Sequence, residues 1–296
     1  MSRPPHAPHP LTRKRQLLRD LPAVSGAERA ALLLDLALEE RGDPQAREAW
    51  LDQALALVPP GDPVARAHVE RVRGTVALVD DRNDQALAHA ERALALVGPD
   101  GPDHVVGPAL VITASVHLRQ RRLGQARQTI AAARRRLTTP DQAEHLLEAD
   151  ALETAIDFLV EGASAVLPRV EGYLDRALAL GSTIRIESAR FNLAHALHRL
   201  GEHDRALRLG FQVRDSRATA GDTLGQARAE NLLGACWWSL GEMDRCADAW
   251  YRAIRVLERL HHTPTRVRVL NNLVSLHVQL GDFDDARSLL GEVEEL

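Results

Sequence analysis

The sequence repeats itself every 40 residues, and a period of this length restricts the chain to folds that stack copies of one small unit. Three related phrases carry the repeat: LGEHDRA begins at residue 200, LGEMDRC at residue 240 and LGDFDDA at residue 280. The same step continues toward the N-terminus as a site for small side chains, since six of its seven positions hold a residue no larger than cysteine. These positions are Ala46, Ala86, Ala126, Val166, Ala206, Cys246 and Ala286. Seven units therefore fill the chain.

Each unit is expected to consist of two antiparallel α-helices. Aromatic residues make up only 3% of the chain while alanine, leucine and arginine dominate, and this balance favours helix over strand. Residues typical of helix ends return with the same period, at Gly61, Gly101, Asp141, Gly181, Gly221 and His261. Two helices can approach closely only where the side chains between them are short, which explains the recurring small residue. The sequence therefore predicts an all-α fold.

The sixth unit resembles a known repeat family. The segment NLLGACWWSLGEMDRCADAWYRAI at residues 231–254 is similar to the tetratricopeptide repeat, whose consensus is large-x-x-Leu-Gly-x-x-Tyr, then Gly, then Ala-x-x-x-Phe-x-x-Ala. The matching residues are Leu233, Gly234, Trp237 in place of Tyr, Gly241, Cys246 in place of Ala, Trp250 in place of Phe, and Ala253. The period is 40 residues instead of about 34, which resembles the lengthened repeats of bacterial regulators and kinesin light chains.

The resemblance covers about residues 27–296 and implies a right-handed superhelical solenoid of antiparallel helix pairs, about seven units long. We expect this solenoid to span residues 25–296. Residues 1–24 are expected to form a flexible arm and a short helix that ends before Pro22. Unit four departs most from the family pattern, because Thr154, Glu161 and Val166 replace the expected Gly, Gly and Ala.

The resemblance also implies that the first helix of each unit lines a concave face that binds a ligand. In units five to seven these positions hold polar side chains: Ser188, Asn192, His195, His198, Arg228, Asn231, Trp238, Arg268, Asn271, Asn272 and Ser275. Asparagine disfavours helix interiors, so its amides here are expected to exchange hydrogen bonds with a peptide backbone. Arg228 and Arg268 recur one repeat apart and would bind acidic groups. The alternative is a solvated helix face whose amides bond between repeats.

A basic stretch in unit three has two interpretations. No acidic residue occurs from His104 to Pro140, and this region holds seven arginines: Arg119, Arg121, Arg122, Arg127, Arg134, Arg135 and Arg136. They could meet an acidic partner or phosphates. Alternatively, they form an outer face that pairs with carboxylates of neighbouring repeats.

Several functional classes find no support in the sequence. A net charge of −4 gives no reason to expect nucleic acid, and no apolar run is long enough for a membrane helix. No phosphate-binding loop, dinucleotide fingerprint, GxSxG or paired-cysteine metal motif occurs, so neither an enzyme nor a cofactor is expected. His195, His198 and His203 straddle a helix and its turn, and we expect no metal there. Cys236 and Cys246 form no disulfide framework, which fits a reducing cytoplasm.

The expected function is that of a scaffold or adaptor that binds a protein or peptide on the concave face. The alternative is a sensory module that controls a separate or downstream output, as in bacterial transcription regulators or diguanylate cyclases. No capping helix is evident after the last unit, and Leu289, Leu290 and Val293 are expected to leave an apolar face that could pack against a second copy.

The register can be tested by overfilling one helix pair. Replacing Ala206 with Trp should lower the melting temperature, because the larger side chain would force the two helices of unit five apart. The measurement is thermal unfolding followed by circular dichroism. A melting temperature equal to that of the wild type would argue against a buried site at this position.

Overall fold

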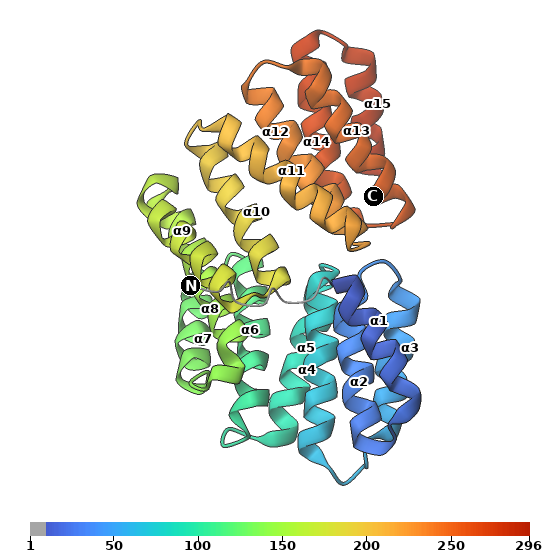
Figure 1. The fold of residues 1–296 in the computed structure, drawn as a ribbon. Helices are drawn as coiled ribbons and strands as arrows, with labels where there is room; N and C mark the ends of the chain where they lie inside the picture. Colours follow the sequence, from blue (N-terminus) through green and yellow to red (C-terminus); the bar gives the residue numbers. More distant parts are fainter. Residues whose placement is uncertain (1–9) are drawn as a thin grey trace. The chain divides into compact units, whose positions relative to one another are not determined.

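The computed structural model describes residues 10–296, and this part of the chain is all helical with no strand (Figure 1). A helix α1, Pro10–Asp20, and a short 3-10 helix, Leu21–Ala23, precede the repeats. α1 is the short helix expected before Pro22, whereas the expected arm falls largely on residues 1–9, outside the described residues. The first helices of the units are α2 (Gly26–Glu39), α4 (Pro63–Val79), α6 (Asp103–Arg119), α8 (Ala143–Glu161), α10 (Thr183–Arg199), α12 (Thr223–Ser239) and α14 (Thr263–Leu280).

The second helices run antiparallel to the first. They are α3 (Pro44–Leu57), α5 (Asn83–Val97), α7 (Leu123–Arg136), α9 (Ala163–Leu180), α11 (His203–Thr219), α13 (Met243–Arg259) and α15 (Phe283–Glu294). From α4 onward every first helix begins 40 residues after the previous one, and the second helices from α5 onward do the same. The predicted fold class, helix pairs in tandem, is therefore confirmed.

The small residues lie where the helices of a pair meet. From unit two onward they are buried: Ala86, Ala126, Val166, Ala206, Cys246 and Ala286. Only Ala46, in the first unit, is partly exposed. The intervening turns follow the same count, because the backbone adopts positive φ at Asp81, Arg121, Gly201, Gly241 and Gly281. The turn geometry is thus imposed by the repeat even where the residue is not glycine, at a cost of about 1–2 kcal/mol for the left-handed conformation.

Unit four shows how its atypical sequence is accommodated. α8 continues through Glu161, and the left-handed turn moves one residue onward to Gly162, whose φ is 88°. Val166 is nevertheless fully buried in the pair, and α9 begins at the residue that the period predicts. The departure is therefore confined to the turn.

The contacts divide the chain into two compact units, which end and begin within α10: unit 1 reaches Ile186 and unit 2 comprises Glu187–Leu296. These two compact units are written with numerals, and each contains several of the seven repeat units that are written in words. The single continuous solenoid over residues 25–296 stays a prediction. No helix within residues 10–296 is both long and apolar enough to cross a bilayer.

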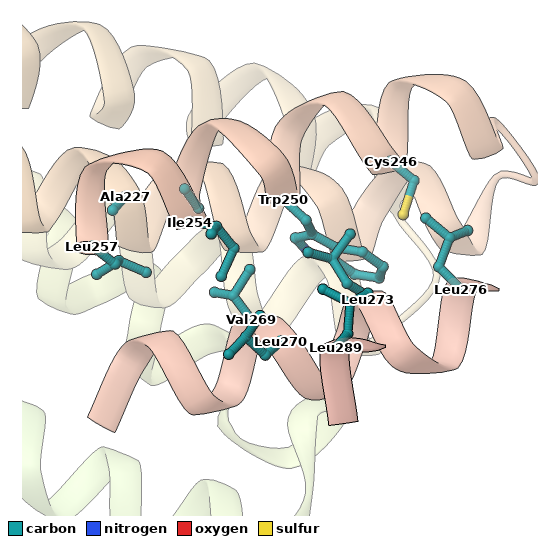
Figure 2. Packing of buried hydrophobic residues seen from close by; sticks show 11 residues of the cluster. Ala227, Cys246, Trp250, Ile254, Leu257, Val269, Leu270, Leu273, Leu276 and Leu289 are labelled. Carbon is teal, nitrogen blue, oxygen red and sulfur yellow. The ribbon is translucent and has the colours of Figure 1, made fainter. Parts of the chain in front are cut away.

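The core of unit 2 is organised around Trp250 (Figure 2). This side chain is 3% exposed, packs with Leu273 and Leu289, and donates a hydrogen bond from Nε1 to the carbonyl oxygen of Asn231 at 3.1 Å. Gly234 makes the packing possible, because a Cβ atom at this position would overlap the indole ring of Trp250. The glycine of the Leu-Gly pair in the tetratricopeptide consensus thus leaves room for Trp250, which stands in place of the consensus phenylalanine.

The expected apolar face on the last helix is smaller than the sequence suggested. Leu289 is buried in the core of unit 2 and Val293 packs against the same cluster. Leu290 is 45% exposed, as expected. The correction arises because α15 turns two of the three side chains toward α13 and α14 instead of outward.

Two glycine substitutions in unit 2 separate packing from helix propensity. Gly234→Ala should lower the melting temperature, because the added methyl group displaces Trp250 at a cost of about 1–3 kcal/mol. Gly291→Ala in α15 has open space around its Cβ and should be neutral or stabilising by up to about 1 kcal/mol. Thermal unfolding of both variants provides the comparison, and equal shifts would contradict the packing assigned to Trp250.

Candidate functional site

The first helices of unit 2 carry the candidate residues of the polar stripe, on α10, α12 and α14. We call the surface that these residues form the inner face of unit 2. His195 on α10 and Arg268 on α14 are two repeats apart, yet the charge of Arg268 acts on the imidazole of His195. Neighbouring packed helices lie about 8–10 Å apart, so helices two repeats apart would be about 16–20 Å apart on a flat layer.

The sequence-predicted site residues all lie on these three helices. Five of them are exposed: Asn192, His195, Arg268, Asn271 and Ser275. Six are partly buried: Ser188, His198, Arg228, Asn231, Trp238 and Asn272. The structure therefore offers the first group directly to a ligand, while the second group also contributes to packing. A role of either group in binding stays a prediction.

Two of the predicted asparagines bond to each other. The Nδ2 atom of Asn272 on α14 donates to Oδ1 of Asn231 on α12 at 2.9 Å. This bond joins consecutive repeats, as the alternative interpretation of the stripe expects. It also fixes the two amides, so that the remaining donor and acceptor positions of the pair have a defined direction.

Trp238 and Trp237 share the same region of α12. The ring of Trp238 lies 5.9 Å from that of Trp250, so part of its surface belongs to the core. Trp237 packs near Phe211 and beneath the guanidinium of Arg245. Both tryptophans are partly buried, and neither is a freely projecting aromatic group.

The exposed polar residues of the inner face have few partners. Among the described residues, the side chains of Asn192, Arg268 and Asn271 make no hydrogen bond or ion pair. Elsewhere in unit 2 arginines are commonly paired: Arg252 donates to Glu230 at 3.1 Å and Arg266 to Glu292 at 3.0 Å. The inner face thus keeps hydrogen-bonding capacity that the fold does not use.

The histidines of this face are held neutral. Crowding by the surrounding helices, followed by the charges of His198, Arg268 and Arg217, lowers the pKa of His195. The ring of His195 also packs edge-on against Phe191, with centroids 4.7 Å apart. A neutral imidazole can both donate and accept a hydrogen bond, which suits a peptide group better than an anion.

Unit 1 carries a polar group that the sequence interpretation missed. His68 and Arg71 on α4 lie 160 residues before Arg228 and Asn231, so they occupy the same repeat positions. Their electrostatic neighbours come from other first helices: Asp35 on α2, and His145 and Glu148 on α8. The 40-residue period could have located this group, because His68 and Arg71 lie at the positions equivalent to Arg228 and Asn231.

The basic stretch of unit three consists largely of paired arginines. Arg119 donates to Asp81 at 2.7 Å, Arg127 to Asp157 at 2.6 Å and Arg136 to Asp103 at 2.8 Å, while Arg134 pairs with Asp150 and Glu153. These carboxylates lie on neighbouring helices or turns. The pairing supports the second interpretation of the stretch, an arginine-rich face that holds repeats together.

One group could hold a metal ion. The ligand atoms of His277, Asp282 and Asp285 lie within 4.8 Å of one another, and Tyr251 Oη is 2.8 Å from Nε2 of His277. Both carboxylates are exposed, and a protonated imidazole between two carboxylates would have the same arrangement. The two cysteines are free and buried, and burial raises the pKa of each thiol to about 12, so neither is poised as a nucleophile.

A small pocket of about 190 Å³ lies between α12 and α13, and none of the candidate site residues lines it. Its lining is mostly charged: Gln226, Ala227, Glu230, Arg252, Arg255, Val256 and Arg259. Glu230 is already bonded to Arg252. The pocket is therefore separate from the inner face.

Solved structures show the same fold. No protein-family model matches the chain, and no curated protein sequence matches it. A Rap protein complexed with Competence and Sporulation Factor is similar with a TM-score of 0.62 and 13% identity, over 97% of each chain. Aspartyl phosphate phosphatase F from Bacillus subtilis gives 0.60 and 13%, over 96% of this chain and 73% of that one.

A third similar structure is a signal transduction ATPase with a tetratricopeptide repeat sensor from Pyrococcus horikoshii. Its TM-score is 0.59 at 10% identity, over 96% of this chain and 43% of the other. The likeness therefore supports a helical-repeat fold. At these identities the comparisons establish the fold alone.

The polar group of unit 1 predicts a pH effect. Burial, followed by the charges of Arg71, His104 and His145, lowers the pKa of His68 from 6.5 to about 3. Between these values the unfolded chain binds more protons than the folded one, so stability falls as the pH drops below 6.5. We expect this histidine to contribute a loss of about 1–3 kcal/mol between pH 6.5 and 4. Urea unfolding of wild type and His68→Gln measures it, and identical pH slopes would refute the assignment.

Proposed function

We propose that this protein binds an extended peptide, or a peptide segment of a partner protein, along the inner face of unit 2. The observation that carries the proposal is a set of exposed side chains on the first helices of unit 2 that make no hydrogen bond or ion pair with the described residues. Arg268 and Asn271 offer a charge and an amide on α14, and Asn192 offers an amide on α10; none has a partner among the described residues. Polar groups kept unpaired on the inner side of a solenoid are available for recognition.

The spacing suits an extended chain. Successive first helices present equivalent positions about 8–10 Å apart, and an extended peptide advances about 3.3 Å per residue. One repeat therefore corresponds to about three peptide residues. Asparagine can hold the backbone by donating and accepting at once, while arginine selects acidic side chains. Affinity would accumulate from modest contacts along the array.

A sensory role is the second candidate, because one similar structure contains a tetratricopeptide repeat sensor. In that case the bound peptide would favour one curvature of the repeats and so influence a separate or downstream output. The recognition surface would be the same, and only the consequence of binding would differ.

We infer that the protein binds a partner and does not catalyse a reaction. We also infer that it works in the cytoplasm. The two buried, free cysteines support a reducing compartment. The packing positions of the cysteines support a scaffold. So does the absence, among the residues named above, of a nucleophile beside a general base.

The test is selection of peptides from a random displayed library, followed by affinity measurements on single variants. Arg268→Ala and Asn271→Ala should each weaken the selected peptides by about 5- to 50-fold, because both lose contacts that the fold itself does not need. Arg255→Ala on α13, an exposed arginine on a different face, should leave affinity unchanged. Equal affinities for all variants would overturn the inner-face proposal.

A further inference from the structure

The turn between α14 and α15 brings one imidazole and two carboxylates together. Nδ1 of His277, near the end of α14, lies 3.6 Å from a carboxylate oxygen of Asp282 and 3.8 Å from one of Asp285. Asp282 is the N-cap residue of α15, and Asp285 lies in the first turn of that helix. The three ligand atoms are all within 4.8 Å of one another. Both helices of the last repeat thus contribute to one small group.

The sixth repeat shows that packing does not require these residue types. There, two aromatic rings lie 6.4 Å apart and a guanidinium covers one of them at 4.8 Å. In the seventh repeat the rings of Tyr251 and His277 keep nearly the same separation, 6.3 Å. The residues of the sixth repeat are Phe211, Trp237 and Arg245, and those 40 positions later are Tyr251, His277 and Asp285. The repeat geometry is therefore kept while all three side chains change chemistry.

The imidazole of His277 has one nitrogen engaged and one unused. The side chain is 12% exposed, and Nδ1 is buried without a hydrogen bond. Nε2 lies 2.8 Å from Oη of Tyr251. Burial, followed by the charges of Asp285 and Glu292, raises the pKa of Tyr251, so its phenol keeps its proton at neutral pH. When Nε2–H donates to this phenol oxygen, the lone pair of Nδ1 lies beside the two carboxylates, and a cation between them would remove the repulsion.

The two carboxylates are not used by the fold. Asp282 accepts no hydrogen bond at the start of α15, whereas Asp222 at the start of α12 accepts one from a backbone N–H at 2.7 Å. Within residues 10–296, no lysine or arginine pairs with Asp282 or Asp285. Their neighbour Asp284 does pair, with Arg287 at 3.2 Å. A neutral imidazole and two carboxylates together match the charge of one divalent cation.

We propose that His277, Asp282 and Asp285 bind one Zn²⁺ ion that ties α14 to α15, with Tyr251 orienting the imidazole. Zinc bonds of about 2.0–2.2 Å in a tetrahedron separate the ligand atoms by about 3.3–3.6 Å. The separations of 3.6 and 3.8 Å from Nδ1 are close to these values. A protonated imidazole would instead donate to a carboxylate at about 2.7–2.9 Å. The fourth position of the ion is left for water, and the bond from Nε2 is the usual support of a zinc-bound histidine.

The proposal does not depend on the peptide-binding function and is tested with the metal alone. The protein is dialysed against a chelator and titrated with Zn²⁺ by calorimetry. Asp285→Asn should weaken zinc binding at least about 10-fold, because even residues that only support a zinc ligand cause losses of this size. Asp284→Asn removes the same charge from the same turn, at a fully exposed side chain, and should bind as the wild type does. No binding by the wild type, or equal affinity in Asp285→Asn, would overturn the site.

A signal from His277 itself shows where the ion binds. In a protein with isotope-labelled histidines, this signal is assigned by its loss in His277→Trp, which introduces the residue that the sixth repeat holds at this position. Zn²⁺ should shift the Nδ1 resonance more than the Nε2 resonance. Ca²⁺ should leave both unchanged, because it prefers oxygen ligands. A His277 signal that does not respond to bound zinc, or tighter binding of Ca²⁺ than of Zn²⁺, would refute the assignment.

Thermal unfolding gives a further readout of the link between the two helices. Zn²⁺ should raise the melting temperature of the wild type and of Asp284→Asn, because the ion binds only the folded turn. It should not raise that of Asp285→Asn or His277→Trp. Equal increases in all four proteins would show that zinc binds elsewhere, and the proposal would fail.

Discussion

The close approach of two helices at a small buried residue, repeated every 40 positions, is the constraint on which the structure depends. Ala86, Ala126, Ala206 and Cys246 are each fully buried between the helices of their pair. A larger side chain at these points would separate the helices and tilt the next pair, because packed helices respond to added volume by moving apart. Within each compact unit, the repeated contact also fixes which side of a first helix packs on its neighbours.

Because of this period, residues that are 40 positions apart lie at equivalent places in successive repeats. Residues 71, 231 and 271 are equivalent, and they hold Arg71, Asn231 and Asn271. In unit 2 the inner face combines a fixed asparagine pair with exposed groups that have no partner in the described chain. In unit 1 the equivalent positions hold His68 and the buried Arg71.

Much of the fold was available from the sequence, since the period, the helix pairs and the small residues are local signals. The one-residue shift of the turn to Gly162 and the inward rotation of Leu289 were not, because both depend on packing with other helices. The placement of the candidate residues on first helices followed from the register. The sequence left open whether the asparagines bond to a ligand or between repeats, because the bond from Asn272 to Asn231 depends on side chains that meet across repeats. The comparisons add the fold of similar structures and leave the ligand open.

The central claim is that ligands contact the first helices. A selected peptide carrying a photoreactive group can be cross-linked to the intact protein, and the modified residues mapped by mass spectrometry. Cross-links on α10, α12 or α14, at or beside Asn192, Arg268 and Asn271, are the predicted result. Cross-links confined to second helices such as α11 and α13 would contradict it.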